Sequence, residues 1–333
     1  MHDPLRAMAA RLMCVGFPGP EVDSGLREML AEGAGGVILF ARNASTAAAV
    51  SALAGDIRRA ASESRRPAPF VSIDHEGGRV MRAREGFTAV PEMRHIGAAG
   101  PEEAARVGAL FARELRACGI DVNFAPVVDV DSNPANPVIG ARSFSRDPAR
   151  VGACASAFIR AMQAGGVAAC AKHFPGHGDT HVDSHLDLPV LPHGLDRLAA
   201  VELLPFRDAI AAGVASVMTA HVVFEALDPG VPATMSARAV DGLLRRELGF
   251  GGVIFSDDLE MKAIADRMDF GEACVRAVEA GCDCLLVCHE LERQRAAIAA
   301  LADAICSGRL PRERIARSHA RLDALSSAYV RGS

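Results

Sequence analysis

The feature that most constrains the fold is an alternation of short apolar runs with longer stretches whose apolar residues recur at helical spacing. The runs are rich in Val, Ile, Leu and Phe, which is typical of buried strands. The eight predicted strands are residues 12–15, 36–40, 70–73, 122–125, 168–171, 216–220, 252–255 and 284–287. Eight strand–helix units in series favour an α/β fold of the single (β/α)8 TIM-barrel type over a doubly wound sheet.

The stretches between these strands predict helices, several of which begin after a capping Ser, Thr or Asp and end before Gly. The principal predicted helices are residues 46–61, 101–117, 148–164, 203–212, 237–248, 270–280 and 291–304. Residues 311–329 have the same spacing and are expected to form an additional C-terminal helix that closes or covers the barrel. The N-terminal residues are expected to lead straight into the first strand. Because no linker or composition shift divides the chain, residues 1–333 are predicted to form one catalytic barrel domain.

Composition and missing motifs exclude several classes of function. The formal net charge of −5 and a pI near 6.1 leave no basic footprint for a nucleic-acid partner. No apolar stretch approaches the roughly 20 residues of a membrane span and no signal peptide is visible, which predicts a cytoplasmic protein without a membrane partner. Nine scattered cysteines predict buried thiols rather than disulfides. The GxGxxG and Walker patterns of nucleotide-binding proteins are missing. We expect the chain to act on a small molecule without a cofactor or metal, and to be a monomer.

Polar side chains follow six of the predicted strands, at the end where a barrel carries its active site. These residues are Asp74, His75, Glu76 and Arg79, then Asp129, Lys172, His173, His221, Asp257, Asp258, His289 and Glu290. One ionisable residue after a strand is commonly a solvated loop residue. Six strand ends of this kind in one barrel indicate a functional site.

The richest of these strand ends is the segment of residues 172–185, which reads KHFPGHGDTHVDSH and holds four of the eleven histidines. Asp183 and His185 are separated by one residue, so in extended backbone their side chains project to the same side. A carboxylate beside an imidazole favours the protonated ring, and such a dyad can protonate a leaving oxygen and then deprotonate water. Asp257, at the end of an aliphatic strand, is suited to act as a nucleophile toward a cationic carbon.

Five motifs carry a resemblance to a known family. They are KHFPGHGDT followed by DSH, DHEGGRVMR at residues 74–82, FAPVVDV at 124–130, RSF at 142–144 and FSDDLEM at 255–261. Together they resemble glycoside hydrolase family 3, and more narrowly its bacterial β-N-acetylhexosaminidases of peptidoglycan recycling. The resemblance covers about residues 10–300. It implies a barrel that removes non-reducing terminal β-linked N-acetylglucosamine from peptidoglycan-derived muropeptides with retention, through a covalent glycosyl-aspartate intermediate.

The resemblance also implies a role for individual residues. Asp257 is the implied nucleophile, His185 the acid/base and Asp183 the partner of His185. The implied substrate-binding residues are Asp74, Arg82, Arg142, Lys172 and His173. Side chains of this kind can form several hydrogen bonds with sugar hydroxyls. Family members commonly carry Gln where this chain has His75, whose imidazole can likewise donate and accept a hydrogen bond.

Three other interpretations remain open. The His/Asp-rich loop 173–185 could bind zinc in a metal-dependent barrel hydrolase, although the first strand lacks the paired histidines that such barrels carry. A sugar-binding module without catalysis would leave Asp257 and the dyad without a function. The adjacent pair Asp257 and Asp258 also fits a mechanism in which the acetamido group of the substrate is the nucleophile. Direct attack by Asp257 is preferred here, and Asp258 is assigned a supporting role.

Overall fold

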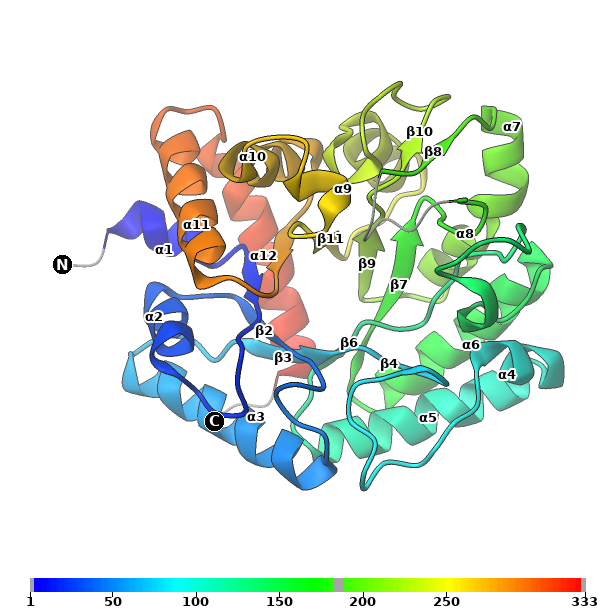
Figure 1. Cartoon of the computed structure of the whole chain (residues 1–333), viewed down its shortest axis with the longest axis horizontal. Helices are drawn as coiled ribbons and strands as arrows, with labels where there is room; N and C mark the ends of the chain where they lie inside the picture. Colours follow the sequence, from blue (N-terminus) through cyan, green and yellow to red (C-terminus); the bar gives the residue numbers. More distant parts are fainter. Residues whose placement is uncertain (1–2, 182–187, 331–333) are drawn as a thin grey trace.

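Eight parallel strands close into a barrel in the computed structural model, which describes residues 3–181 and 188–330. Their bounds are β1 Met13–Val15, β2 Gly36–Leu39, β3 Phe70–Ile73, β6 Val122–Asn123, β7 Ala168–Phe174, β9 Ser216–Thr219, β11 Val253–Asp258 and β12 Cys284–Val287 (Figure 1). All eight predicted strands are present, in chain order around the barrel. The predicted (β/α)8 fold is therefore confirmed.

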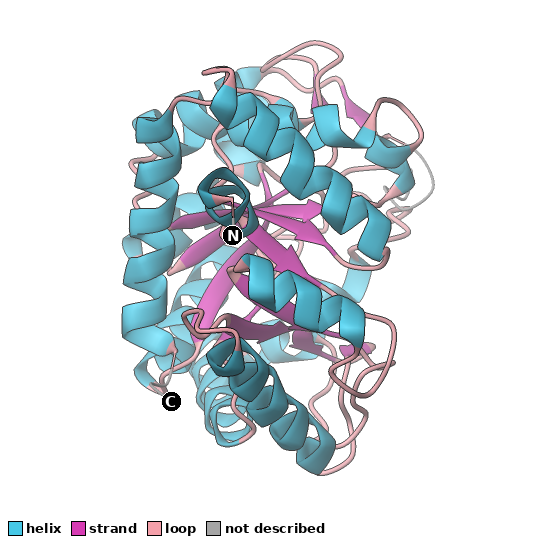
Figure 2. Ribbon diagram, turned by 90° about the vertical axis from the view of Figure 1, so that its left-hand side faces the viewer, coloured by secondary structure: helices cyan, strands magenta, loops and turns pink. Residues whose placement is uncertain are grey.

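Helices form the outer layer around these strands (Figure 2). The main helices are α1 Pro4–Ala10, α2 Ser24–Glu32, α3 Ala47–Glu63, α4 Met93–Ala99, α5 Pro101–Ala117, α6 Pro148–Ala164, α8 Leu204–Ala211, α10 Phe270–Ala280, α11 Leu291–Cys306 and α12 Arg312–Tyr329. Shorter or π-type segments are η1 Gly140–Arg142, α7 Leu195–Arg197, η2 Leu198–Glu202, η3 Ala233–Met235, η4 Arg238–Glu247 and α9 Lys262–Ala265. The predicted C-terminal helix is α12. No helix in the described ranges is long and apolar enough to cross a bilayer.

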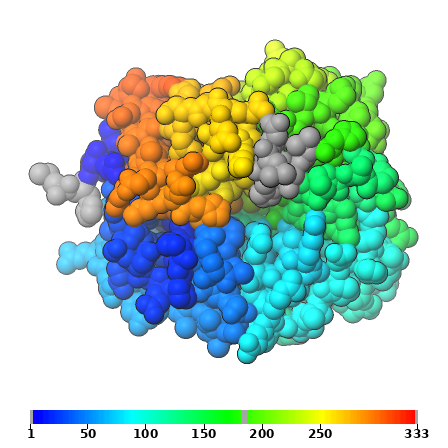
Figure 3. Space-filling model, in the orientation of Figure 1, coloured from blue at the N-terminus to red at the C-terminus, as the bar shows by residue number. Residues whose placement is uncertain are grey.

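The barrel closes between the first and last strands of the chain. β1 pairs in parallel with β12, Met13 opposite Leu285 and Val15 opposite Val287, and on its other side with β2. The space-filling view shows the result, since the blue N-terminal and orange C-terminal parts of the chain lie side by side (Figure 3).

Apolar rings fill the barrel interior. Phe255 of β11 contacts Phe70 of β3 and Phe124, with ring centroids 5.7 and 5.2 Å apart. Because β3 and β11 are not neighbours in the sheet, this contact crosses the interior and makes it a packed core rather than a channel.

Ion pairs at the amino ends of the strands tie the outer helices to the barrel. Asp283, which precedes β12, is fully buried. It accepts hydrogen bonds from Ser318 at 2.6 Å and from Arg321 at 3.0 Å, both on α12, and it also pairs with Arg245 of η4. At this end of the barrel, the buried carboxylate of Asp283 thus joins β12 to η4 and α12.

Two short helices and two small strand pairs differ from the prediction. Helix α1 precedes β1, where the chain was expected to enter the strand at once, and α2 lies between β1 and β2. Both helices have only seven to nine residues, too few for a clear helical period, although Asp3 and Asp23 cap them by accepting backbone N–H groups. Two-residue and three-residue strands also form small pairs outside the barrel, β4 His75–Gly77 with β5 Val80–Met81 and β8 Val190–Leu191 with β10 Val223–Phe224.

Candidate active site

A cavity of about 650 Å3 opens at the carboxyl ends of the barrel strands. Its lining includes six of the eight residues to which the sequence assigns a role, namely Asp74, Arg82, Arg142, Lys172, His173 and Asp257. The other two, Asp183 and His185, lie outside the described residues. The fold therefore gathers into one pocket six predicted residues that are widely separated along the chain.

Five charged side chains form a chain of ion pairs in the pocket lining. Lys172 Nζ lies 2.7 Å from a carboxylate oxygen of Asp74 and 2.7 Å from one of Glu76. Arg142 donates two hydrogen bonds of 2.8 Å to Glu76. Arg82 is 3.5 Å from Asp74, and its Nε is buried without a hydrogen-bond partner in the described part of the chain. Arg82 therefore keeps a donor that a ligand can satisfy.

The same ion pairs keep these groups ionised despite burial. Burial raises the pKa of Glu76, but Arg142 and Lys172 outweigh it and hold that pKa far below its ordinary value. Burial lowers the pKa of Lys172, and Asp74 and Glu76 raise it above its ordinary value. A buried charge is stable only when it is paired and hydrogen-bonded, as each of these is. The pocket therefore offers fixed donors and acceptors to a polar ligand.

Asp257 lies at the end of β11 as a partly buried anion. Its carboxylate accepts the backbone N–H of Asp258 at 2.8 Å. Burial raises the pKa of Asp257, but the positive fields of His173 and His221 act against it. Together with the backbone hydrogen bond and Lys172, these fields keep the pKa of Asp257 below its ordinary value. An ionised carboxylate on a rigid strand, facing a pocket, has the properties of a nucleophile.

Asp129 holds the start of the histidine-rich segment. It is almost completely buried, and His173 Nδ1 lies 2.7 Å from its Oδ2. The backbone N–H of His177 donates to Oδ1 at 2.7 Å, and the backbone N–H of His173 donates to the same carboxylate at 3.2 Å. Burial raises the pKa of Asp129, and these partners lower it below its ordinary value. One anion thus fixes both the backbone and the ring of His173.

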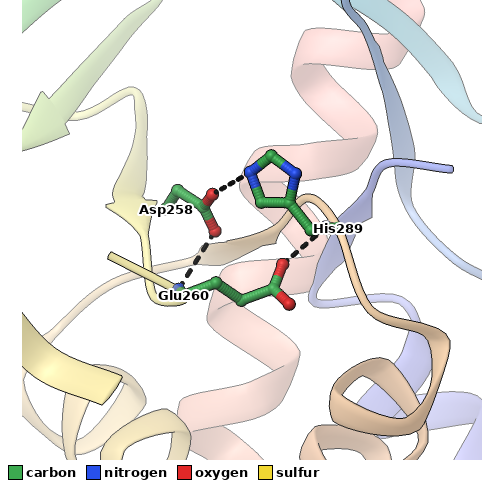
Figure 4. A group of neighbouring side chains, drawn as sticks. All are labelled: Asp258, Glu260 and His289. Atoms are coloured by element: carbon green, nitrogen blue, oxygen red, sulfur yellow. Dashed lines mark hydrogen bonds and ion pairs between the residues drawn. The ribbon is translucent and has the colours of Figure 1, made fainter. Parts of the chain in front are cut away.

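Asp258, Glu260 and His289 form a group at the side of the pocket (Figure 4). His289 Nε2 is 3.1 Å from Asp258 Oδ2, and Asp258 Oδ1 accepts the backbone N–H of Glu260 at 3.1 Å. Glu260 accepts the backbone N–H groups of His289 and Glu290. The hydrogen bond to Asp258 raises the pKa of His289. Asp258 therefore orders the turn after β11 and its neighbour after β12, which agrees with its predicted supporting role.

The zinc interpretation required the histidine-rich loop to bring its ligands together. In the described ranges, only Asp258, Glu260 and His289 place three atoms of metal-binding residue types within 4.8 Å of one another. His177 Nδ1 contacts Thr180 Oγ1 at 2.8 Å, and His181 Nδ1 contacts Asn133 at 3.0 Å. The histidines of residues 173–181 therefore point to different partners rather than to one centre.

His75 is fully buried and does not line the pocket. Its ring is buried against Phe87 and Phe111, with centroids 5.0 and 4.7 Å away. Both ring nitrogens lack a hydrogen-bond partner in the described part of the chain. Burial, with a smaller contribution from Arg84, lowers the pKa of His75 to about 4. Within the described residues the ring nitrogens of His75 thus make no hydrogen bond, and the ring instead packs on Phe111 of α5.

Two residues of the site have no role in the sequence-based account. Glu76 joins Arg142 to Lys172, and Asp129 anchors His173. Both stand in the motifs, one within DHEGGRVMR and one within FAPVVDV, directly after predicted strands. Their position gave the signal, but a sequence does not tell which carboxylate faces a ligand and which faces another side chain.

Comparison with known proteins places the chain among carbohydrate-active enzymes. Residues 5–325 match the glycosyl hydrolase family 3 N terminal domain. Beta-hexosaminidase A of Pseudoalteromonas piscicida is 40% identical over 323 residues, which cover 90% of this chain and 54% of that protein. This chain thus spans about half the length of that relative.

Two solved structures are also similar to the chain. The glycoside hydrolase family 3 beta-N-acetylglucosaminidase from Paenibacillus sp. superposes with a TM-score of 0.97 at 46% identity, over 99% of this chain and 64% of that one. NagZ from Neisseria gonorrhoeae, in complex with N-trifluoroacetyl-D-glucosamine, superposes with a TM-score of 0.78 at 34% identity. That match covers 95% of this chain and 98% of the other.

Proposed function

Because the chain belongs to glycosyl hydrolase family 3, we propose that it is a β-N-acetylhexosaminidase that removes a terminal β-linked N-acetylglucosamine. The relatives described above bear the names of this activity, and one of them was solved with an N-acylated glucosamine. The observation that carries the proposal is the ionised Asp257 in a pocket lined with fixed charged donors. A pocket of this kind suits a substrate that is rich in hydroxyl groups and reacts through a cationic carbon.

The proposed mechanism proceeds with retention through two displacements. Asp257 attacks the anomeric carbon and forms a glycosyl ester, while His185, supported by Asp183, protonates the departing oxygen. In the second step His185 takes a proton from water, and the water oxygen displaces the Asp257 carboxylate. An imidazole suits both steps because its ordinary pKa lies near neutrality.

Binding of the sugar is assigned to the charged residues of the pocket. Arg82 Nε has no hydrogen-bond partner among the described residues, and Arg142 and Lys172 are held rigidly by Glu76. Rigid donors lose little conformational entropy when they bind hydroxyl groups. We assign Asp74 and His173 to the same task, since both line the cavity beside these cations.

For the natural substrate we propose muropeptides derived from peptidoglycan, which carry carboxylates on the departing part. Two exposed cations, Arg79 and Lys262, lie in the pocket lining on different elements. Neither belongs to the ion-pair chain around Glu76 and Lys172. They are available to attract a negatively charged aglycone.

The test is hydrolysis of aryl glycosides that differ only in the sugar. The aryl β-N-acetylglucosaminide should be cleaved, while the β-glucoside and the α-anomer of the amino sugar should not. Proton NMR of the first product should show the β-anomer before mutarotation, as a retaining enzyme requires. Cleavage of none of the three sugars would overturn the proposed activity, and early release of the α-anomer would overturn the two-step mechanism.

A further inference from the structure

We propose that His221 is a positioning residue that holds the end of β11 in place and thereby aligns the carboxylate of Asp257 for attack. This role rests on the proposed function, because it concerns the nucleophile of that reaction. His221 does not itself line the pocket, so it acts on Asp257 through the backbone of the strand.

Asp257 stands where β11 leaves its regular pairing. On one side β11 pairs with β9 as far as Phe255, which lies opposite Met218, and the described pairing of the two strands goes no further. On the other side β11 pairs with β12 at Phe255 and again at Asp258, with a shift of register between them. A shift of this kind interrupts the ladder and re-aims the side chains. The strand end that carries Asp257 therefore needs support from outside the ladder.

His221 supplies such support from the β9 side. It follows β9 and is fully buried, and its Nε2 lies 3.0 Å from the backbone carbonyl oxygen of Asp258. A carbonyl oxygen can only accept, so Nε2 carries a proton and donates it. The backbone N–H of Asp258 donates in turn to Oδ1 of Asp257 at 2.8 Å. A single residue, Asp258, thus joins the imidazole to the nucleophile by two hydrogen bonds.

The ring of His221 is also held at its other nitrogen. Nδ1 lies 2.8 Å from Oγ1 of Thr234, a fully buried residue of η3. The same oxygen contacts Oγ1 of Thr219 at 2.9 Å and the backbone oxygen of Ala220 at 3.0 Å. The ring therefore cannot turn without breaking a hydrogen bond. A side chain locked in this way can hold the backbone that it binds in one position.

The position of Asp257 affects both proposed steps. The hydrogen bond from Asp258 to Oδ1 fixes the plane of the carboxylate, and this plane sets the direction of Oδ2. In the first step an Asp257 oxygen bonds to the anomeric carbon while the leaving oxygen departs with its electron pair. In the second step water displaces that oxygen, and the electron pair returns to the carboxylate. Because the bond to Asp257 is partly formed in both transition states, a displaced carboxylate slows both steps.

The test compares His221→Asn with His221→Gln on the full chain. The amide nitrogen of Gln reaches about as far as Nε2 of histidine and can donate to the Asp258 carbonyl, whereas the shorter Asn cannot reach it. Neither amide carries a charge, so the hydrogen bond is the main difference between the two variants. His319→Asn is the matched control. Nε2 of His319, on α12, contacts the backbone oxygen of Met8 at 3.0 Å and lies outside the pocket lining.

The measured quantity is the single-turnover rate constant for release of dinitrophenolate from a dinitrophenyl β-N-acetylglucosaminide, with enzyme in saturating excess. This leaving group departs without a proton, so the acid does not enter the rate. Under these conditions the rate constant does not depend on the fraction of protein that is folded. A partly unfolded sample therefore cannot imitate a misplaced nucleophile.

For His221→Asn we expect this rate constant to fall about 10- to 100-fold, the loss that a small misplacement of reacting groups causes. The inhibition constant of N-acetylglucosamine should stay that of the wild type, because the sugar-binding side chains keep their ion pairs. His221→Gln should restore most of the rate, and His319→Asn should retain the rate of the wild type.

Thr234 provides a second measurement that leaves the buried ring in place. Thr234→Val removes the contact to Nδ1 and should lower the single-turnover rate constant in the same direction. Thr234→Ser keeps the hydroxyl and should restore the rate. If Thr234 acts through His221, adding Thr234→Val to His221→Asn should lower the rate constant no further.

Equal rate constants for His221→Asn and His221→Gln would overturn the inference. If both were slow, the charge or shape of the ring would be responsible, and if both were fast, the hydrogen bond would have no effect. A weaker inhibition by N-acetylglucosamine in proportion to the loss of rate would also overturn it, since His221 would then serve substrate binding. A wild-type protein without activity would instead overturn the proposed function.

Discussion

At the scale of single residues, the carboxylates in and beside the pocket differ in the groups that they contact. Glu76 and Asp129 are neutralised by side chains that hold them, whereas Asp257 accepts only a backbone N–H at short range among its described contacts. The positive fields of nearby side chains lower the pKa of Asp257 but do not take up its carboxylate oxygens with short hydrogen bonds. That difference separates a carboxylate free to react from two carboxylates that serve as structural anchors.

The acid/base role of His185 makes a prediction at this scale. His185→Ala should lower kcat/KM about 100-fold or more for glycosides with poor leaving groups, which need a proton to depart. It should have little effect on kcat/KM for the dinitrophenyl glycoside, because that leaving group departs as an anion. The measurement is kcat/KM across a series of aryl leaving groups. His181→Ala, in the same segment, is the control and should leave the series unchanged. Equal losses for all leaving groups would assign the acid role to another residue.

At the scale of elements, the strands and long helices could be predicted from the sequence, and the short elements could not. Runs such as residues 284–287 and the 17 residues of α5 contain enough of their period to be recognised. Helix α1 and the hairpin β4–β5 are too short, and only tertiary contacts determine them. The site shows the same limit. Lys172 and Asp257 lie at the carboxyl ends of long barrel strands, so the sequence could indicate them. The orientation of His75 depends on how the hairpin packs on α5.

The buried ring of His75 makes a prediction for the hairpin. His75→Leu should stabilise the protein by about 1 kcal/mol at pH 7, because it removes two ring nitrogens buried without partners. The pKa of His75 is about 4 when folded and near 6.5 when unfolded, so the unfolded state binds the proton more tightly. Stability is therefore fully present above pH 6.5 and is lost as the pH falls toward 4, by about 3 kcal/mol in total.

Urea unfolding between pH 4 and 8 measures this effect. The difference in unfolding free energy between His75→Leu and the wild type should grow as the pH falls from 6.5 to 4 and stay constant above 7. His75→Gln, which restores the residue common in the family, serves as the polar control. A difference that does not change with pH would mean that the ring is not buried in its neutral form.

At the scale of the whole molecule, the two ends of the barrel have different tasks. The carboxyl ends carry the pocket, and the amino ends carry the buried ion pairs of Asp121 and Asp283. Asp121 accepts a hydrogen bond of 2.7 Å from the guanidinium of Arg58. Asp283 accepts hydrogen bonds from side chains of η4 and α12. In barrels of this type, residues at the amino ends serve stability and those at the carboxyl ends serve catalysis.

This division predicts different effects for one aspartate at each end of the barrel. Asp283→Ala should lower the free energy of unfolding by about 3–5 kcal/mol, because it leaves Arg245 and Arg321 without their buried partner. Its kcat at a temperature well below unfolding should match that of the wild type. Asp257→Ala should abolish turnover and lower the free energy of unfolding much less than Asp283→Ala does, since among its described contacts the Asp257 carboxylate accepts only a backbone N–H. Denaturant melts and initial rates on both variants test the pair, and the reverse pattern would contradict it.

The pairing of β1 with β12 also has a consequence for the nascent chain. When β1 leaves the ribosome, the partner that closes the barrel has not yet been made, and at ordinary rates of translation it emerges roughly half a minute later. During that interval one edge of β1 is exposed to other polypeptides. A chain that stops before residue 284 never obtains this cover. Truncated products should therefore aggregate or be retained by chaperones, however many complete strand–helix units they contain.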